Sequence, residues 1–402
     1  MPVWLDAIPD KAAHIPRPDT RRWLLFLVFV MLGGITLTFW NWTTERTGFV
    51  FWFSTLGLPF CSWGLLFSVR RFAYKAEQVG AESRNVERKI LIEREVLRGQ
   101  RYAWILGSHV QTLAGNKSGE LLTAMVRAVP VGDILQPRGC TKPVRYAGMI
   151  GFQEDFSHEL KATVSKLATR VKNIADALPL SVSCWLMLDC ESDIYAQVET
   201  QLKDELSGKT ERVFRLISGK GLAAFDTWLD KHWDNPSILA AITLSVPASP
   251  LEGDADAITL VVLSNRKATD FPDALCLHRP EIGTNDSLSK TLNRALLWAR
   301  LQPEALQGSW FTGAELTQGS CWNKACEDNG VTFSLTEQNL GIDPVLGYAG
   351  GASPWLAIML AGSVCEERGP QVIAAQPAAD KDDIWITVIA KEEIRKGSPE
   401  NV

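Results

Sequence analysis

The sequence WLLFLVFVMLGGITLTFW at residues 23–40 is followed, after a short polar loop, by GFVFWFSTLGLPFCSWGLLFSV at residues 48–69. Neither run contains Asp, Glu, Lys, Arg or His. A helix needs about 20 apolar residues to cross a hydrocarbon core roughly 30 Å thick, and both runs reach that length with little help from their flanks. The pair therefore predicts a transmembrane hairpin over residues 23–69, with helices at about 23–42 and 48–69.

Basic residues flank this hairpin on its two outer sides. Arg21 and Arg22 precede the first run, Arg70 and Arg71 follow the second, and the connecting loop has only Arg46. Since basic flanks remain in the cytoplasm, we expect a multi-pass protein of the bacterial inner membrane with cytoplasmic N- and C-terminal regions. The alternative, a signal peptide followed by a buried core helix, fits less well because a polar segment precedes the first run and no cleavage pattern follows it.

Composition limits the ligands that the chain can bind. Its 402 residues carry a net charge of -5, which argues against a nucleic-acid partner and leaves the lipid bilayer and a protein as the expected partners. The eight cysteines show no CxxC and no Cys/His spacing suited to zinc, so no metal site is expected. Scattered thiols also suit a reducing cytoplasm.

The pattern along the chain predicts six segments. A cytoplasmic segment at 1–22 precedes the hairpin, and a charged helical stalk at 70–100, rich in Glu, Arg, Lys and Ala, follows it. We expect a mixed α/β domain at 101–180, a second α/β domain at 181–391 and a tail at 392–402. In the second domain, apolar strands alternate with helices, which predicts a sheet covered on both faces and two similar halves.

Three segments of this second domain resemble the thiolase and ketoacyl-synthase condensing enzymes. They are LISGKGL at 216–222, where such enzymes carry a nucleophilic cysteine, the strands at 240–245 and 256–264, and GYAGGAS at 347–353, which resembles their Gly-His loop. The resemblance covers about residues 180–390. It implies a thiolase-like layered sheet in the C-terminal half of the chain.

The positions that the resemblance would make catalytic are altered. No cysteine occurs from Ser218 to Gly221, Tyr348 stands where a histidine is expected, and residues 310–315 contain no histidine. Tyrosine and lysine do not replace a thiolate and imidazoles in acyl condensation. We therefore expect a degenerate scaffold that is not an enzyme, with no catalytic residue and no cofactor. Cys190 is the one competing nucleophile, although a buried strand-end thiol is the favoured interpretation.

The overall arrangement also resembles the type VI secretion lipase adapter family. This resemblance implies an adapter or chaperone that recruits a protein effector to a bacterial type VI secretion machine. A membrane-tethered acyl-transfer enzyme and a structural subunit of a membrane complex remain as alternatives. Four tryptophans in predicted loops or at helix ends are expected to anchor the protein partner, although core packing is their ordinary role: Trp233, Trp310, Trp322 and Trp355.

Overall fold

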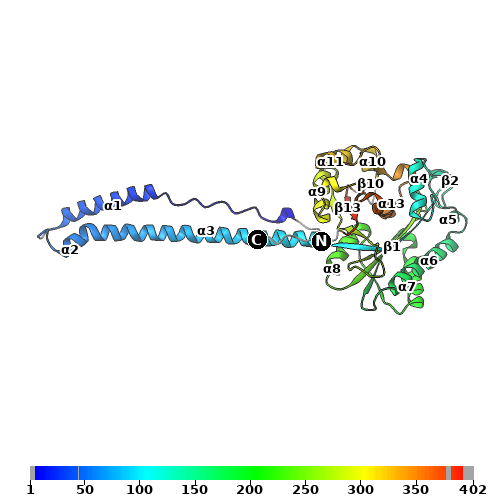
Figure 1. Ribbon diagram of the computed structural model, residues 1–402, viewed down its shortest axis with the longest axis horizontal. Helices are drawn as coiled ribbons and strands as arrows, with labels where there is room; N and C mark the ends of the chain where they lie inside the picture. Colours follow the sequence, from blue (N-terminus) through cyan, green and yellow to red (C-terminus); the bar gives the residue numbers. More distant parts are fainter. Residues whose placement is uncertain (1–4, 44, 377–381, 393–402) are drawn as a thin grey trace. The chain divides into compact units, whose positions relative to one another are not determined.

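The computed structural model describes residues 5–43, 45–376 and 382–392 (Figure 1). These residues form two compact units, one made of Trp4–Glu95 and one that begins at Val96. Each unit is described separately below. Residues 393–402 of the expected tail lie outside the described residues.

The first unit contains the expected helical hairpin. Its elements are η1 (Leu5–Ala7), α1 (Thr20–Asn41), α2 (Phe49–Trp52), the π-helical turn η2 (Phe53–Gly57) and the part of α3 (Leu58–Gly99) up to Glu95. Two helices, Thr20–Asn41 and Phe49–Gly99, are long and apolar enough to cross a membrane. The stalk expected at 70–100 is the direct continuation of the second of these helices.

The two arms of the hairpin pack against each other. The indole of Trp63 donates a hydrogen bond to the carbonyl of Trp23 at 2.9 Å. Beyond the apolar runs, the amide of Ala12 donates to Asn85 Oδ1 at 2.9 Å, and Arg88 Nε donates to the carbonyl of Pro9 at 2.6 Å. The segment before α1 therefore lies along the charged part of α3.

The second unit is built on one eleven-stranded sheet, in the order β11-β10-β12-β13-β8-β1-β7-β6-β4-β5, with β9 paired to β13. The strands are β1 (Tyr102–Thr112), β4 (Ser183–Cys190), β5 (Phe214–Leu216), β6 (Ser237–Ser245), β7 (Ala257–Ser264), β8 (Leu275–His278), β9 (Glu281–Gly283), β10 (Gly308–Thr312), β11 (Asn339–Gly341), β12 (Gln371–Ala375) and β13 (Ile384–Ala390). A separate hairpin pairs β2 (Asp133–Leu135) with β3 (Val144–Tyr146).

Helices cover this sheet and connect its strands (Figure 1). They are α4 (Ser118–Arg127), α5 (Ile150–Glu154), α6 (Phe156–Asp176), α7 (Ser192–Lys209), α8 (Gly221–Lys231), α9 (Leu288–Ala299), α10 (Ala314–Gln318), α11 (Cys321–Asn329), α12 (Asp343–Leu346) and α13 (Ser353–Arg368). Short 3-10 turns occur at η3 (Asn285–Ser287), η4 (Pro303–Ala305) and η5 (Gly350–Ala352).

The strand order repeats in two halves. In β5-β4-β6-β7 the first three strands are parallel and the last is antiparallel, and β11-β10-β12-β13 follows the same rule. Helix α8 precedes β6 in the first half, as α13 precedes β12 in the second. Both helices bury side chains in one shared core, which includes Phe225 and Leu356. The two similar halves expected from the sequence are therefore present.

The domain boundary expected at residue 180 is wrong. Strand β1, from the expected first domain, lies in the middle of the sheet between β7 and β8. Its residues Trp104 and Leu106 share a core with Leu160 of α6 and Ile194 of α7. Since β1 pairs with β7 along most of its length and with β8 at its start, residues 101–180 form one unit with the rest of the sheet.

Candidate functional site

The first half of the site lies where β4 ends and α8 begins. In an α/β sheet, ligands bind beyond the carboxyl ends of the parallel strands. Here Lys220 precedes α8, and its Nζ lies 2.8 Å from Asp189 Oδ1 and 3.4 Å from the carbonyl of Cys190. The hydrogen bond with Asp189 raises the pKa of Lys220. Lys220 is therefore a cation at neutral pH and lacks the free lone pair of an amine nucleophile.

The loop that precedes α13 reaches this cluster from the second half. Its Tyr348 accepts a backbone hydrogen bond from Ala255 and donates one to Gly253, each at 2.9 Å. A Cβ atom on Gly351 would lie 2.7 Å from Asp189 Oδ2, so the carboxylate approaches bare backbone there. Only glycine allows this approach, which brings the starts of α8 and α13 to the same carboxylate.

A buried carboxyl group organises the second half of the site. Asp343 Oδ1 accepts a hydrogen bond from the Thr312 hydroxyl, and Oδ2 accepts one from the Gly313 amide, both at 2.6 Å. Burial raises the pKa of Asp343 to about 6, although these two donors oppose the shift. Beside it, the Tyr348 hydroxyl donates to the carbonyl of Gln376 at 3.2 Å. The site therefore holds a carboxyl group that can exchange a proton near neutral pH.

The sequence-predicted site positions are only partly brought together. Lys220 and the Tyr348 loop meet at Asp189, whereas Ser218 lies in the turn between β5 and α8. Cys190 is buried at the end of β4, and burial raises the pKa of its thiol to about 12. A thiol with such a pKa is protonated at neutral pH, so the structure favours the interpretation of Cys190 as a packed strand-end residue.

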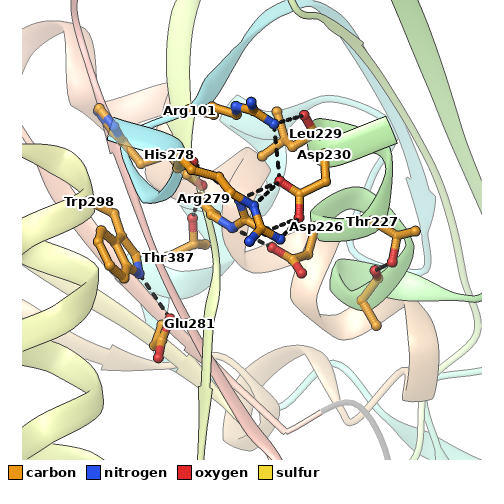
Figure 2. Close-up of polar contacts among 12 residues, drawn as sticks. Arg101, Asp226, Thr227, Leu229, Asp230, His278, Arg279, Glu281, Trp298 and Thr387 are labelled. Atoms are coloured by element: carbon orange, nitrogen blue, oxygen red, sulfur yellow. Dashed lines mark hydrogen bonds and ion pairs between the residues drawn. The ribbon is translucent and has the colours of Figure 1, made fainter. Parts of the chain in front are cut away.

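A buried ion cluster occupies the opposite end of α8. Figure 2 shows Arg279 between Asp226 and Asp230, with Arg101 beside Asp230. Arg279 Nε lies 2.6 Å from Asp226 Oδ1, while Nη1 and Nη2 donate to the two oxygens of Asp230 at 2.9 and 2.8 Å. Arg98, near the end of α3, adds two hydrogen bonds to Asp230 at 3.1 and 2.6 Å. The fork of Arg279 thus joins β8 to α8.

The two carboxyl groups of this cluster respond to burial in opposite ways. Burial raises the pKa of Asp226 and outweighs the attraction of Arg279. Burial also acts on Asp230, but hydrogen bonds from Arg279 and Arg98 outweigh it and lower the pKa. Sequence reasoning missed this cluster. The available signals were a pair of acidic residues four apart on an apolar helix and a lone arginine after a short apolar run.

Three of the four tryptophans expected to anchor a partner are buried. Trp310, Trp322 and Trp355 are 2%, 1% and 0% exposed, so the expectation is wrong for them. The indole of Trp322 donates to Ser309 Oγ at 2.9 Å inside the domain. Trp310 lies in strand β10, and Trp322 and Trp355 lie near the starts of α11 and α13; the sequence pattern did not distinguish these core positions from surface ones. Trp233 is half-buried, with guanidinium groups near its ring.

Among the residues that the structure describes, no group of three or more His, Cys, Asp or Glu side chains could hold a metal ion. No protein-family model and no curated protein sequence match the chain.

Solved structures of ketosynthases share the fold. The keto synthase-chain length factor PfaC matches with a TM-score of 0.53 at 8% identity, over 73% of this chain and 43% of its own length. The module 6 ketosynthase of the Bacillus subtilis bacillaene synthase gives 0.52 at 9% identity, over 73% of this chain and 71% of its own. The Streptomyces albus oxazolomycin ketosynthase domain gives 0.51 at 9% identity, over 74% and 77%. The chain therefore has the thiolase-like ketosynthase fold.

These neighbours correct one conclusion drawn from the sequence. The missing cysteine and histidines led to the conclusion that the chain is not an enzyme, yet its structural neighbours are ketosynthases. The conclusion is wrong because a few altered residues in short motifs do not show that an enzyme fold lacks activity. At 8 to 9% identity, the likeness establishes an enzyme fold and carries over no residue positions, including those said to be altered.

Proposed function

We propose that this chain with a ketosynthase fold is a membrane-anchored adapter, which holds a protein partner at the membrane surface. The observation that carries the proposal is a set of exposed apolar side chains on the segments that follow β1 and β6. We call this set the insertion patch: Val126, Val129, Ile134, Ile150 and Leu251, which are 59 to 76% exposed.

Two of the segments that carry the insertion patch are joined by backbone hydrogen bonds. Ile134 on β2 pairs with Arg145 on β3, and the carbonyl of Arg145 accepts a hydrogen bond from Gly253 at 3.0 Å. Large exposed apolar groups rimmed by polar residues are typical of protein-binding surfaces. Isolated exposed apolar residues are ordinary, so the support comes from five such residues on segments of which two are joined by backbone hydrogen bonds.

The hairpin supports the anchoring part of the proposal. We propose that both apolar helices cross the bacterial inner membrane and leave the two ends of the chain in the cytoplasm. The hydrogen bonds of Ala12 and Arg88 support this topology, because they join the segment before α1 to the segment after the second span. A reporter placed between Trp42 and Thr47 should then behave as external and one after Val402 as cytoplasmic. The opposite pattern would refute the topology.

The partner can be sought with the full chain in mild detergent after crosslinking in cells. The double variant Ile134→Asp, Leu251→Asp should lower recovery of the partner about tenfold or more, because charge is introduced into the centre of an apolar contact. Leu180→Asp is the matched control, since Leu180 is an equally exposed apolar residue outside the insertion patch. Recovery that is unchanged by the double variant, or lowered equally by the control, contradicts the proposal.

The narrower proposal is that the partner is an effector of a type VI secretion machine. It is supported by the resemblance of the overall arrangement to the lipase adapter family. Deleting the protein should then abolish secretion of one effector and leave secretion of others intact. Normal secretion of every effector would refute this narrower proposal and would not affect the proposal of a membrane adapter.

A second candidate function is acyl transfer by a membrane-tethered enzyme. The observation that favours it is the meeting of the starts of α8 and α13 at Asp189 in a fold that ketosynthases use. Incubation of the full chain with an acyl-thioester analogue, followed by mass spectrometry, tests this candidate. Stoichiometric acylation of one residue near Lys220 supports transfer chemistry, and absence of any adduct counts against it.

A further inference from the structure

One edge of β1 lacks a neighbouring strand over part of its length. Strand β1 pairs with β7 from Trp104 to Thr112, but it pairs with β8 only from Tyr102 to Ile105. Within the described residues, the edge of residues 107–111 that faces away from β7 is paired with no strand. Such an edge presents N–H and C=O groups to which another extended chain can pair.

A β-bulge determines where the side chains beside this edge point. The pairing register with β7 shifts between Ile105 and Gly107. A Cβ on Gly107 would lie 2.8 Å from Ile174 of α6, and Gln111 donates to Glu159 of α6 at 3.4 Å. After the bulge, the odd-numbered residues of β1 therefore face α6. Bulges often re-aim side chains in this way beside functional sites.

Cavities lie on both faces of the sheet at this edge. On the α6 side is a groove of about 1120 Å³, here called the β1–α6 groove, whose lining includes His109, Gln111, Lys117, Lys166 and Arg170. On the α13 side is a cavity of about 310 Å³, lined by the buried Ile358 and Met359 and by the exposed carboxylates Asp273 and Glu366. Ser108 and Ser118 line both cavities, so the two meet at the unpaired edge.

The β1–α6 groove carries uncompensated positive charge. Three cations line it, with Glu159 as the one carboxylate, although the whole chain has a net charge of -5. Lys166 and Arg170 are four residues apart on α6, a spacing at which like charges repel. Neither makes an ion pair within the described residues, whereas Lys172, Lys203 and Lys209 each pair with a carboxylate four residues away.

The pKa of the half-buried His109 is lowered in part by the same two cations of α6. Burial, together with the charges of Arg170 and Lys166, lowers its pKa to about 4. Two cations therefore face the floor of the β1–α6 groove without a carboxylate that balances them. His109 stays neutral at pH 7, so the positive charge of the groove comes from its lysine and arginine side chains.

We propose that an extended acidic segment of a protein partner pairs with the unpaired edge of β1, with its carboxylates at Lys166 and Arg170. The proposal rests on the proposed function, because it takes the partner to be a protein. Main-chain hydrogen bonds supply affinity in this mode of recognition, and the pockets for alternate side chains supply specificity.

The two cavities define the sequence that such a segment should have. Successive side chains of an added strand point to opposite faces of the sheet. Those on the α6 side meet Lys166 and Arg170, which favours Asp or Glu. Those on the α13 side meet a cavity that Asp273 and Glu366 line, which disfavours a second acidic residue and favours an uncharged one. The segment lining the groove on α6, from Glu159 to Asn173, is about 21 Å long, which equals about six residues of extended chain.

The test uses the full chain in detergent and a synthetic blocked peptide, Glu-Val-Glu-Val-Glu-Val, whose affinity is measured by fluorescence anisotropy. Three probes accompany it: the same composition with the glutamates and valines in two blocks, a version with one central valine replaced by proline, and inorganic phosphate. The double variant Lys166→Glu, Arg170→Glu is compared with Lys161→Glu, an exposed lysine of α6 outside the β1–α6 groove.

The alternating peptide should bind at least tenfold more tightly than the block or proline peptide, and it should slow backbone deuterium exchange in residues 107–111. The double variant should weaken this binding at least tenfold, and Lys161→Glu less than twofold. Equal binding of all three peptides indicates non-specific charge attraction and overturns the proposal, as does competition by millimolar phosphate alone. The cellular partner is also recovered with each double variant. If Ile134→Asp, Leu251→Asp lowers its recovery but Lys166→Glu, Arg170→Glu does not, the adapter function stands and strand pairing at β1 is refuted.

Discussion

The ion cluster at the end of α8 gives the sharpest test of how the fold is held together. We predict that Arg279→Met destabilises the α/β unit by about 3 to 5 kcal/mol, the usual cost of breaking a buried charge pair. Arg279 is 1% exposed, and its partners Asp226 and Asp230 are 7% and 13% exposed, so solvent screens these contacts little. Asp230 keeps its contacts with Arg98 and Arg101, but Asp226 loses the 2.6 Å contact with Nε.

Protonation of Asp226 limits the loss. Burial already raises the pKa of this carboxyl group, so it can take up a proton once Arg279 is gone, which places the expected cost near 3 kcal/mol. For the same reason, Arg279→Met should lower the free energy of unfolding less in the Asp226→Asn background than in the wild-type chain. The coupling free energy between the two substitutions should therefore be about 1 to 3 kcal/mol, well above the additivity error of about 0.5 kcal/mol.

Guanidinium unfolding of the full chain in detergent, followed by tryptophan fluorescence, measures these quantities. Lys172→Met is the control, because Lys172 pairs with Asp176 at 2.8 Å while the two side chains are 31% and 40% exposed, so its loss should cost about 1 kcal/mol or less. Additive effects of Arg279→Met and Asp226→Asn would refute the reasoning, because they would mean that the two side chains do not interact in solution. A loss no larger than that of the control would do the same.

Three further outcomes follow from the same contacts. A fragment that begins at Val96 should be about 1.5 to 3 kcal/mol more stable than one that begins at Arg101, because Arg98 donates two hydrogen bonds to the carboxylate of Asp230. Equal unfolding midpoints of the two fragments would contradict this. Trp322→Ala should cost about 3 to 5 kcal/mol in thermal or denaturant unfolding, as a core residue does, and a negligible loss would show that the indole is not packed. Burial lowers the pKa of His278 from 6.5 to about 4, so the unfolded chain binds a proton at a higher pH than the folded chain does. The free energy of unfolding should therefore fall by about 3 kcal/mol as the pH falls from 6.5 to 4. His278→Gln should flatten this part of the stability profile.

Long buried elements were the part of the fold that the sequence predicted well. Strands β6 and β7 are buried at every position, and both read as apolar runs bounded by turn residues. Such long elements can be predicted because each one buries many side chains, and these form an apolar pattern in the sequence.

Short strands were missed for the opposite reason. β9 and β11 have three residues each, too few to show a period of two, and they exist because a longer neighbour supplies the pairing. In β1 the sequence shows a clear alternation only at Tyr102, Trp104 and Leu106, whereas the strand continues to Thr112 beyond its bulge. The bulge interrupts the alternation of buried positions, so the pattern in the sequence ends before the strand does.

The site was harder to predict than the fold because its groups come from distant segments. Asp189 meets the Gly351 backbone across 162 residues of chain, and Arg279 meets Asp226 across 53, so neither pair forms a motif of fixed spacing. The Lys220–Asp189 pair joins the start of α8 to β4. Arg279, which follows β8, contacts Asp226 on the same helix. Contacts between segments so far apart in the chain are visible only in the folded structure, so the surfaces described above, and not a short motif, supply the testable functional signals.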